Sequence, residues 1–378
     1  MVMDVKYKGQ LYERIVIKDN YIEDLSELDI FREYNNRLLL PNELDGAQNS
    51  KYAIITSIIY GDDAILDFHF QLKLLYALGG ESYLLEDITG SQVFSGEWLK
   101  SSAMSDIPPS PDNMYKTDSV HDGHEEVWLH SHGFNRLGIM DLDILYAVED
   151  PRKQYSMFTM LIKYLIDNKE LAVNNIPFYV NEDIKIVLID AAASIPLALR
   201  LANKQSIIGG YEDRDDQHLR GRSAIFILDE SNNYNFVNSI IENLSDNPIF
   251  WISSKETQRM SEKSVETYEY FKMIYNDKYT EDEKWEFLVK VGCLVDESVN
   301  DEDKEHLWFE VTKIEGNDIT GILINEPYYI KSMKAGQPFI FDYNKLTEWT
   351  IYAPDGLQIV PENVFAYPFL YLNYNKSN

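Results

Sequence analysis

The chain has 378 residues and a mass of 44.0 kDa, a length that predicts two domains at about 100–200 residues each. Apolar residues make up 45% and charged residues 26%, which excludes a disordered chain, a collagen and a coiled-coil rod. The 63 acidic residues outnumber the 34 basic ones, and the net charge of −29 opposes binding to nucleic acids and to anionic membrane surfaces.

Cysteine content and hydropathy predict the compartment. Cys293 is the only cysteine, so no internal disulfide can form, as is typical of a reducing cytoplasm. The first residues lack the apolar core of a signal peptide, and no stretch reaches the ~18–20 apolar residues of a membrane-spanning helix. We therefore expect a protein of the bacterial cytoplasm.

Helix and strand patterns alternate through the first two thirds of the chain. Residues 62–78 carry apolar side chains at helical spacing, and Gly79 and Gly80 are expected to end that helix. The elements expected after it are strands at 83–85 and 93–94, a proline-rich loop at 107–113, a strand at 125–132, a helix at 140–148 ended by Pro151, a helix at 153–168, a buried strand at 184–189, a helix at 191–203, a polar loop at 209–222 and a buried strand at 224–228. This order predicts an α+β domain with a mixed sheet.

The last third of the chain has a different pattern. Residues 255–262 are polar apart from Met260, and we place a boundary there, which gives domains at 1–258 and 259–378. The elements expected beyond it are a helix at 261–276 and strands at 285–291, 307–314, 319–324, 339–343 and 349–352. About five strands in roughly ninety residues predict a small α+β domain dominated by antiparallel strands, with a curved or barrel-like sheet beside one helix.

Four of the seven histidines lie within twelve residues: His121, His124, His130 and His132. Side chains alternate along a strand, so His130 and His132 are expected on the same face of the strand at 125–132. Two neutral imidazoles at this spacing can bind one divalent metal such as zinc, and Asp143 is a candidate to complete the site. The alternative is structural: the pair hydrogen-bonds a loop and closes the edge of a sheet.

The spacing of these residues resembles that of metal-dependent isopeptidases of the JAMM type, which carry His-x-His-Pro and an aspartate after ten further residues. Here ten residues separate His132 from Asp143. Gly133 stands in place of the family's proline, Met140 stands in place of its serine, and no upstream glutamate can be matched. The resemblance implies a metal-activated water that attacks an amide carbonyl.

A second polar group lies in the loop at 209–222. Asp213 or His218 could add a ligand to the histidine pair, and these two residues with Arg214 are secondary site candidates. The arginines of the loop could hold a carboxylate or phosphate of a small ligand in a pocket beside the histidine strand. The alternative reading is ion pairing with the acidic residues nearby.

Two further resemblances cover most of the chain. The motif Trp-Leu-His-Ser-His-Gly at 128–133, with the segment 67–75 upstream, is similar to an uncharacterised bacterial domain-of-unknown-function family over about residues 1–255. The segments 287–290, 305–308, 321–327 and 334–337 resemble a second uncharacterised small bacterial domain over about residues 262–365. Neither resemblance implies an activity. The one functional suggestion that the two resemblances carry is an association with bacterial immunity proteins.

Two hypotheses of function follow, and the sequence leaves open whether the protein is an enzyme. The first is a non-catalytic, acidic cytoplasmic binding protein, either immunity-like or for a basic protein partner, with neither nucleic acid nor membrane as a target. The alternative is a metal-dependent hydrolase with a His-x-His-x10-Asp site formed by His130, His132 and Asp143, for which the cofactor would be a divalent metal such as zinc. The sequence does not indicate an oligomeric state.

Overall fold

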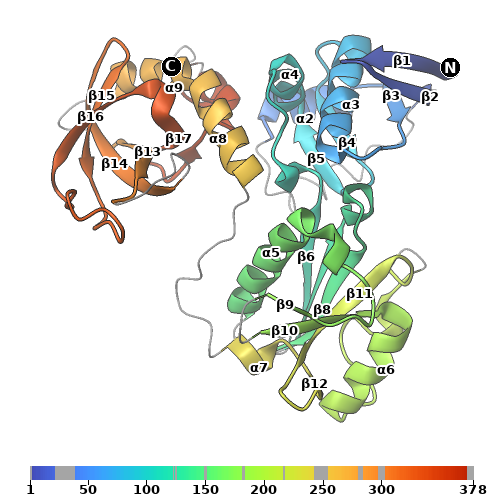
Figure 1. Cartoon of the computed structure of the whole chain (residues 1–378). Coiled ribbons are helices and arrows are strands. Elements are labelled where there is room, and N and C mark those ends of the chain that lie inside the picture. Colours follow the sequence, from blue (N-terminus) through green and yellow to red (C-terminus); the bar gives the residue numbers. More distant parts are fainter. Residues whose placement is uncertain are drawn as a thin grey trace.

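The computed structural model describes residues 2–21, 39–121, 123, 126–148, 151–180, 184–215, 218–241, 254–279, 284–296 and 303–372. Figure 1 shows these residues in three bodies: an N-terminal one around helix α3 (Ala64–Gly79), a middle one built on the sheet that contains β8 (Asp141–Ala147), and a C-terminal one built on the sheet that contains β13 (Glu286–Leu294). Within the described ranges, no helix combines the length and the apolar character needed to cross a bilayer. The mixture of helices with mixed and antiparallel sheets confirms the α+β class.

The N-terminal body packs helices beside an antiparallel sheet. Its elements are β1 (Val2–Tyr7), β2 (Gln10–Tyr21), α2 (Pro41–Gln48), β3 (Tyr52–Ser57), α3 (Ala64–Gly79), β4 (Leu84–Asp87), β5 (Gln92–Ser95) and α4 (Gly96–Met104). The predicted helix at 62–78 is confirmed as α3. Asp63 caps its start by accepting a hydrogen bond from the Leu66 N–H at 3.1 Å, and Gly80 ends it with a φ of 62°.

The middle body is a seven-stranded mixed sheet between two helical layers. Its strands follow the spatial order β6 (Lys116–His121), β7 (Val127–His132), β8 (Asp141–Ala147), β11 (Arg222–Leu228), β10 (Lys185–Asp190) and β9 (Phe178–Tyr179), and β12 (Tyr234–Asn235) pairs with β11. One face, which includes Leu129 and Ile144, packs against α5 (Pro151–Asp167). The other, which includes Leu145 and Phe226, packs against α6 (Ala191–Ala202). The short helix α7 (Asn238–Ile241) follows β12.

The predicted helix at 140–148 is wrong, because these residues form strand β8 in the middle of the sheet. Leu142, Ile144 and Leu145 are all buried, so apolar residues face both sides of this strand. A short apolar run of this kind has no distinct period, and the pairing of β8 with β7 and β11 decides its conformation. Pro151 does not end a helix but begins α5, where a missing N–H has no cost.

The C-terminal body is an open, antiparallel six-stranded sheet with two helices. Its elements are α8 (Ser254–Glu266), α9 (Tyr268–Lys278), β13 (Glu286–Leu294), β14 (Lys304–Glu315), β15 (Asp318–Leu323), β16 (Pro338–Asp342), β17 (Leu346–Tyr352) and β18 (Gln358–Ile359). In the strand order β16-β15-β14-β13-β17-β18, the two edge strands β16 and β18 do not pair with each other, so the sheet is not a closed barrel. The helix expected at 261–276 is divided at Thr267, and its first part starts at Ser254, so that it includes the whole polar segment 255–262.

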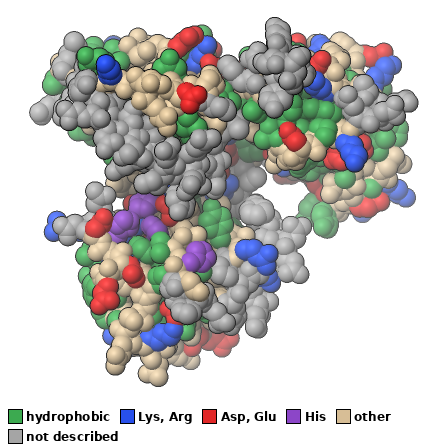
Figure 2. All heavy atoms as spheres, turned by 180° about the vertical axis from the view of Figure 1, so that it is seen from behind, with side chains coloured by type: hydrophobic (Ala, Val, Ile, Leu, Met, Phe, Trp, Pro, Cys, Tyr) green, Lys and Arg blue, Asp and Glu red, His purple; other side chains and the backbone are tan. Residues whose placement is uncertain are grey.

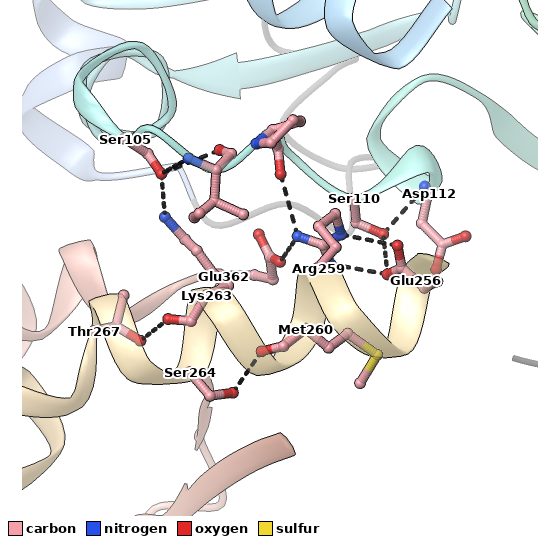
Figure 3. A network of polar contacts seen from close by, with 12 residues as sticks. Ser105, Ser110, Asp112, Glu256, Arg259, Met260, Lys263, Ser264, Thr267 and Glu362 are labelled. Atoms are coloured by element: carbon pink, nitrogen blue, oxygen red, sulfur yellow. Dashed lines mark hydrogen bonds and ion pairs between the residues drawn. The ribbon is translucent and has the colours of Figure 1, made fainter. Parts of the chain in front are cut away.

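Polar contacts of α8 join the C-terminal and N-terminal bodies (Figure 3). Arg259 lies at the centre, where its Nη1 donates to Glu362 at 2.7 Å and to the Pro108 carbonyl at 3.2 Å. Its Nε and Nη2 donate to Glu256 on the preceding turn, both at 2.8 Å. One turn later, Lys263 Nζ donates to Ser105 Oγ at 3.0 Å. The contact therefore depends on charged hydrogen bonds around a largely buried guanidinium.

Replacing Arg259 with alanine is expected to lower the free energy of unfolding by about 1–3 kcal/mol, because two carboxylates and one carbonyl lose their donor. The partial exposure of Glu256 and Glu362 keeps the cost below that of a fully buried pair. Lys313→Ala is the control, since Lys313 forms a solvent-exposed ion pair with Glu315 at 2.7 Å. Urea unfolding of the full chain measures both variants, and equal midpoints would contradict the role given to Arg259.

We expect the protein to lose stability in acid because the buried imidazole of His69 resists protonation. This α3 side chain is 2% exposed, and its Nε2 donates to the Ser102 carbonyl at 3.0 Å. Burial, followed by the charge of Lys73, lowers the pKa of His69 to about 4. Between about pH 6.5 and 4 the unfolded chain therefore binds more protons at this site, and stability falls as the pH falls, by about 3 kcal/mol at most. His69→Gln keeps a donor and does not titrate, so its urea midpoint should fall less across this window than that of the unsubstituted protein.

Candidate metal centre

The motif at 128–133 places two imidazoles at the end of β7. His130 and His132 lie two residues apart on the strand, on the α6 side of the sheet. Gly133 follows with a φ of 102°, and a Cβ there would lie 2.6 Å from the Met114 carbonyl oxygen. Glycine is therefore required for the chain to turn directly after His132.

His218, from the loop between α6 and β11, joins the pair. One candidate ligand nitrogen from each of His130, His132 and His218 lies within 4.8 Å of the other two. His130 is buried, and its Nδ1 has no hydrogen-bond partner among the residues that the structure describes, whereas His132 and His218 are half-buried. Figure 2 shows histidine side chains gathered beside acidic ones on the surface of the middle body.

The three rings are nearly perpendicular to one another. Their centroids are 4.9 Å apart for His130–His132, 5.1 Å for His132–His218 and 5.5 Å for His130–His218, with interplanar angles of 80°, 83° and 77°. Three imidazoles bound to one tetrahedral zinc at 2.0–2.1 Å would have centroids about 5.2 Å apart. The spacing of the ring centroids is therefore close to that of three ligands around one ion.

Carboxylates lie beside two of the three rings. Asp215 Oδ1 is 2.7 Å from Nδ1 of His218, which leaves Nε2 of this ring for another partner. Asp118 on β6 stands opposite His130 in the strand register, and its Oδ2 is 3.8 Å from Nε2 of His132. A carboxylate that binds the second nitrogen of a ligating imidazole fixes the orientation of the ring, and Asp215 meets this condition.

Asp143 lies next to the cluster, fully buried on β8. It is opposite His130 in the register of β7 and β8, on a strand where the sequence predicts a helix. Its Oδ2 is 2.8 Å from Nη1 of Arg214, and its Oδ1 is 3.3 Å from Nε of Arg222. Asp143 is not in the group of gathered ligand atoms, because its carboxylate faces the two guanidiniums.

The electrostatic setting keeps two of the rings neutral. Burial, followed by the charges of His132 and Arg222, lowers the pKa of His130 to about 2. Burial and Arg222 lower the pKa of His132 to about 4, although Asp118 opposes the shift. Neutral imidazole is the form that binds a metal, so no proton competes for these rings at neutral pH.

The remaining predicted residues have other positions. Asp213 accepts a hydrogen bond from the Gly209 N–H at 2.8 Å and so shapes the loop. His121 is exposed at the end of β6, outside the cluster, and His124 lies outside the described residues. Arg214 and Arg222 form ion pairs with Asp143 of β8, which lies outside the loop, whereas the sequence suggested the neighbouring carboxylates of the loop as partners.

Sequence reasoning missed Trp128 and Asp118. Trp128 stacks on His130 with centroids 4.0 Å apart, and its indole N–H donates to Asp143 at 3.3 Å. Its place at i−2 from His130 was the available signal, because a strand puts the two side chains on one face. Asp118 offered no signal, since the pairing of β6 with β7 could not be predicted from the polar sequence of β6.

Three models of protein families match the chain. Residues 1–109 match the N-terminal domain of a protein of unknown function (DUF4026), and residues 114–226 match the C-terminal domain of the same family. Residues 254–358 match an uncharacterized protein conserved in bacteria (DUF2314). The expected resemblance to two uncharacterised bacterial families is thus confirmed, and the histidine cluster lies wholly within 114–226. No curated protein and no solved structure matched in these comparisons.

Proposed function

We propose that this chain, which matches two uncharacterised families, binds a divalent transition metal through His130, His132 and His218, and that zinc is the preferred metal. The observation that carries the proposal is the set of three mutually perpendicular imidazoles at the spacing of ligands to one ion. Imidazole suits zinc, and the rings of His130 and His132 are neutral and buried enough to bind it at neutral pH. Compared with the His-x-His-x10-Asp site, His218 takes the place of Asp143.

Three protein ligands leave one position of a tetrahedral ion open, as in catalytic zinc sites. A water bound there would have its pKa lowered towards 7, and the Asp118 carboxylate, 3.8 Å from His132 Nε2, lies where it could take the proton. The resulting hydroxide could add to the carbonyl carbon of a substrate. The bond from that carbon to the leaving group could then break as the leaving group takes up the proton that Asp118 removed from the water. Metal-assisted hydrolysis is therefore the reaction class that we propose for this centre.

Cobalt(II) tests both the site and its open position. We expect one equivalent of Co²⁺ to give the intense visible absorption of a four-coordinate ion, and added thiocyanate to shift that absorption by entering the open position. The protein must carry no histidine tag. His121→Ala is the matched control, because His121 is exposed and lies outside the cluster, and its spectrum should match that of the unsubstituted protein. A pale, six-coordinate spectrum that saturates only at millimolar metal would count against the proposal.

A second candidate is the non-catalytic binding protein for a basic partner. The net charge of −29 favours it, because such a charge attracts basic proteins and speeds their association. Immobilised protein should then retain a basic protein that moderate salt releases, since exposed charge pairs are screened. If the immobilised protein retains no basic protein, or if salt does not release what it retains, this candidate is wrong.

A further inference from the structure

We infer that Arg214 is a positioning residue for the metal site: it fixes His218 relative to His130 and thereby sets the metal affinity. The inference rests on the proposed metal binding. Two of the ligands come from strand β7, which is paired on both sides and therefore rigid. The third comes from a loop, whose ordering has an entropic cost that something else must offset before a metal can bind tightly.

The Arg214 side chain holds the loop at two points. Its Nε donates to the Gly209 carbonyl at 2.6 Å, and its Nη1 donates to the His218 carbonyl at 2.7 Å. The same Nη1 lies 2.8 Å from Asp143 on β8, and the Arg214 side chain has no exposed surface. One guanidinium thus connects the start of the loop, the ligand residue and the sheet.

The same side chain also reaches the first ligand. The Arg214 guanidinium lies over the Trp128 ring, 4.6 Å from its centroid, and Trp128 stacks on His130 at 4.0 Å. The Trp128 indole N–H and Arg214 both contact Asp143, so this carboxylate holds the indole and the guanidinium together. Arginine has a planar guanidinium that can stack on an aromatic ring and donate hydrogen bonds in several directions at once. The ammonium group of lysine lacks this geometry.

Gly209 provides independent evidence that the loop is held against this stack. It has a φ of 77°, and a Cβ at Gly209 would lie 2.5 Å from the Trp128 ring. Only glycine therefore allows the backbone to approach the indole this closely. The loop that carries His218 therefore packs against Trp128, the side chain that stacks on His130.

The test is a double-mutant cycle on zinc affinity, measured in the full chain by competition with a chromophoric chelator. Arg214→Lys keeps the charge and removes the fork, and we expect it to weaken zinc binding by about 10–100-fold, the range seen when residues that orient ligands are changed. The loss should disappear when Arg214→Lys is made in a His218→Ala background, because the residue acts through that ligand. Arg220→Lys, an exposed arginine of the same loop, is the matched control.

The outcomes separate the inference from the proposed function. If the unsubstituted protein binds zinc and Arg214→Lys binds it equally well, or if the loss is the same in both backgrounds, the positioning role is overturned and metal binding stands. If the unsubstituted protein does not bind zinc, both fail. Should Arg214→Lys not fold, Gly209→Ala tests the same support where the buried backbone of the loop meets the Trp128 ring, with a loss of affinity that again vanishes in the His218→Ala background.

Discussion

Replacing His130 with alanine is expected to lower the zinc affinity by about 100-fold or more. Structural zinc sites with four ligands bind with about 10–16 kcal/mol, which is about 3 kcal/mol for each ligand, and the variant keeps only two of three. His130 is the best choice for this test because it is the most buried of the three rings and its Nδ1 has no hydrogen-bond partner within the described part of the chain. Competition with a chromophoric chelator, on protein without a tag, measures the change.

The control for this prediction is His121→Ala, which removes an exposed imidazole from β6 and should leave the affinity unchanged. Circular dichroism and the urea midpoint, recorded without metal, show whether His130→Ala is folded. A folded His130→Ala protein that binds zinc as tightly as the unsubstituted one would remove this ring from the site.

Replacing Asp143 with alanine is expected to cost about 3–5 kcal/mol of stability, the largest loss we predict for a single substitution. The variant leaves two buried guanidiniums, those of Arg214 and Arg222, without their shared carboxylate, and uncompensated buried charge is the main cost of breaking such pairs. The indole N–H of Trp128 loses its acceptor as well. Urea unfolding monitored by tryptophan fluorescence measures the loss.

A matched variant separates charge from packing at this position. Asp143→Asn keeps the size and one acceptor oxygen, so its cost isolates the missing negative charge. The reading of Asp143 as the counter-ion of two arginines requires both variants to be strongly destabilised without metal. A loss below about 1 kcal/mol for Asp143→Ala would contradict it.

Local patterns in the sequence predicted much of the fold. The capped helix at 62–78 and the strands at 184–189 and 224–228 are confirmed as α3, β10 and β11, because each pattern matches the period and the burial of its element. The alternating strands of the last third are confirmed as an antiparallel sheet for the same reason. Strand β8 was mistaken for a helix, since only its partners β7 and β11 distinguish the two.

The candidate site was predicted in part. Strand alternation placed His130 and His132 on one face, and that is a property of the local chain. The third member lies in a distant loop of the sequence, and the sequence offers Asp213 and His218 without a means to choose between them. The choice comes from tertiary contacts: Asp213 binds the Gly209 N–H, whereas Arg214 holds the His218 backbone beside the sheet.

The most direct test of the metal centre is the zinc K-edge X-ray absorption spectrum of the full-length protein, free of any tag and loaded with one equivalent of Zn²⁺. We predict a first shell of nitrogen or oxygen at about 2.0–2.1 Å with the outer-shell scattering of three imidazoles, reduced to two in His218→Ala. A zinc ion that washes off, or a spectrum without imidazole scattering, would contradict the account.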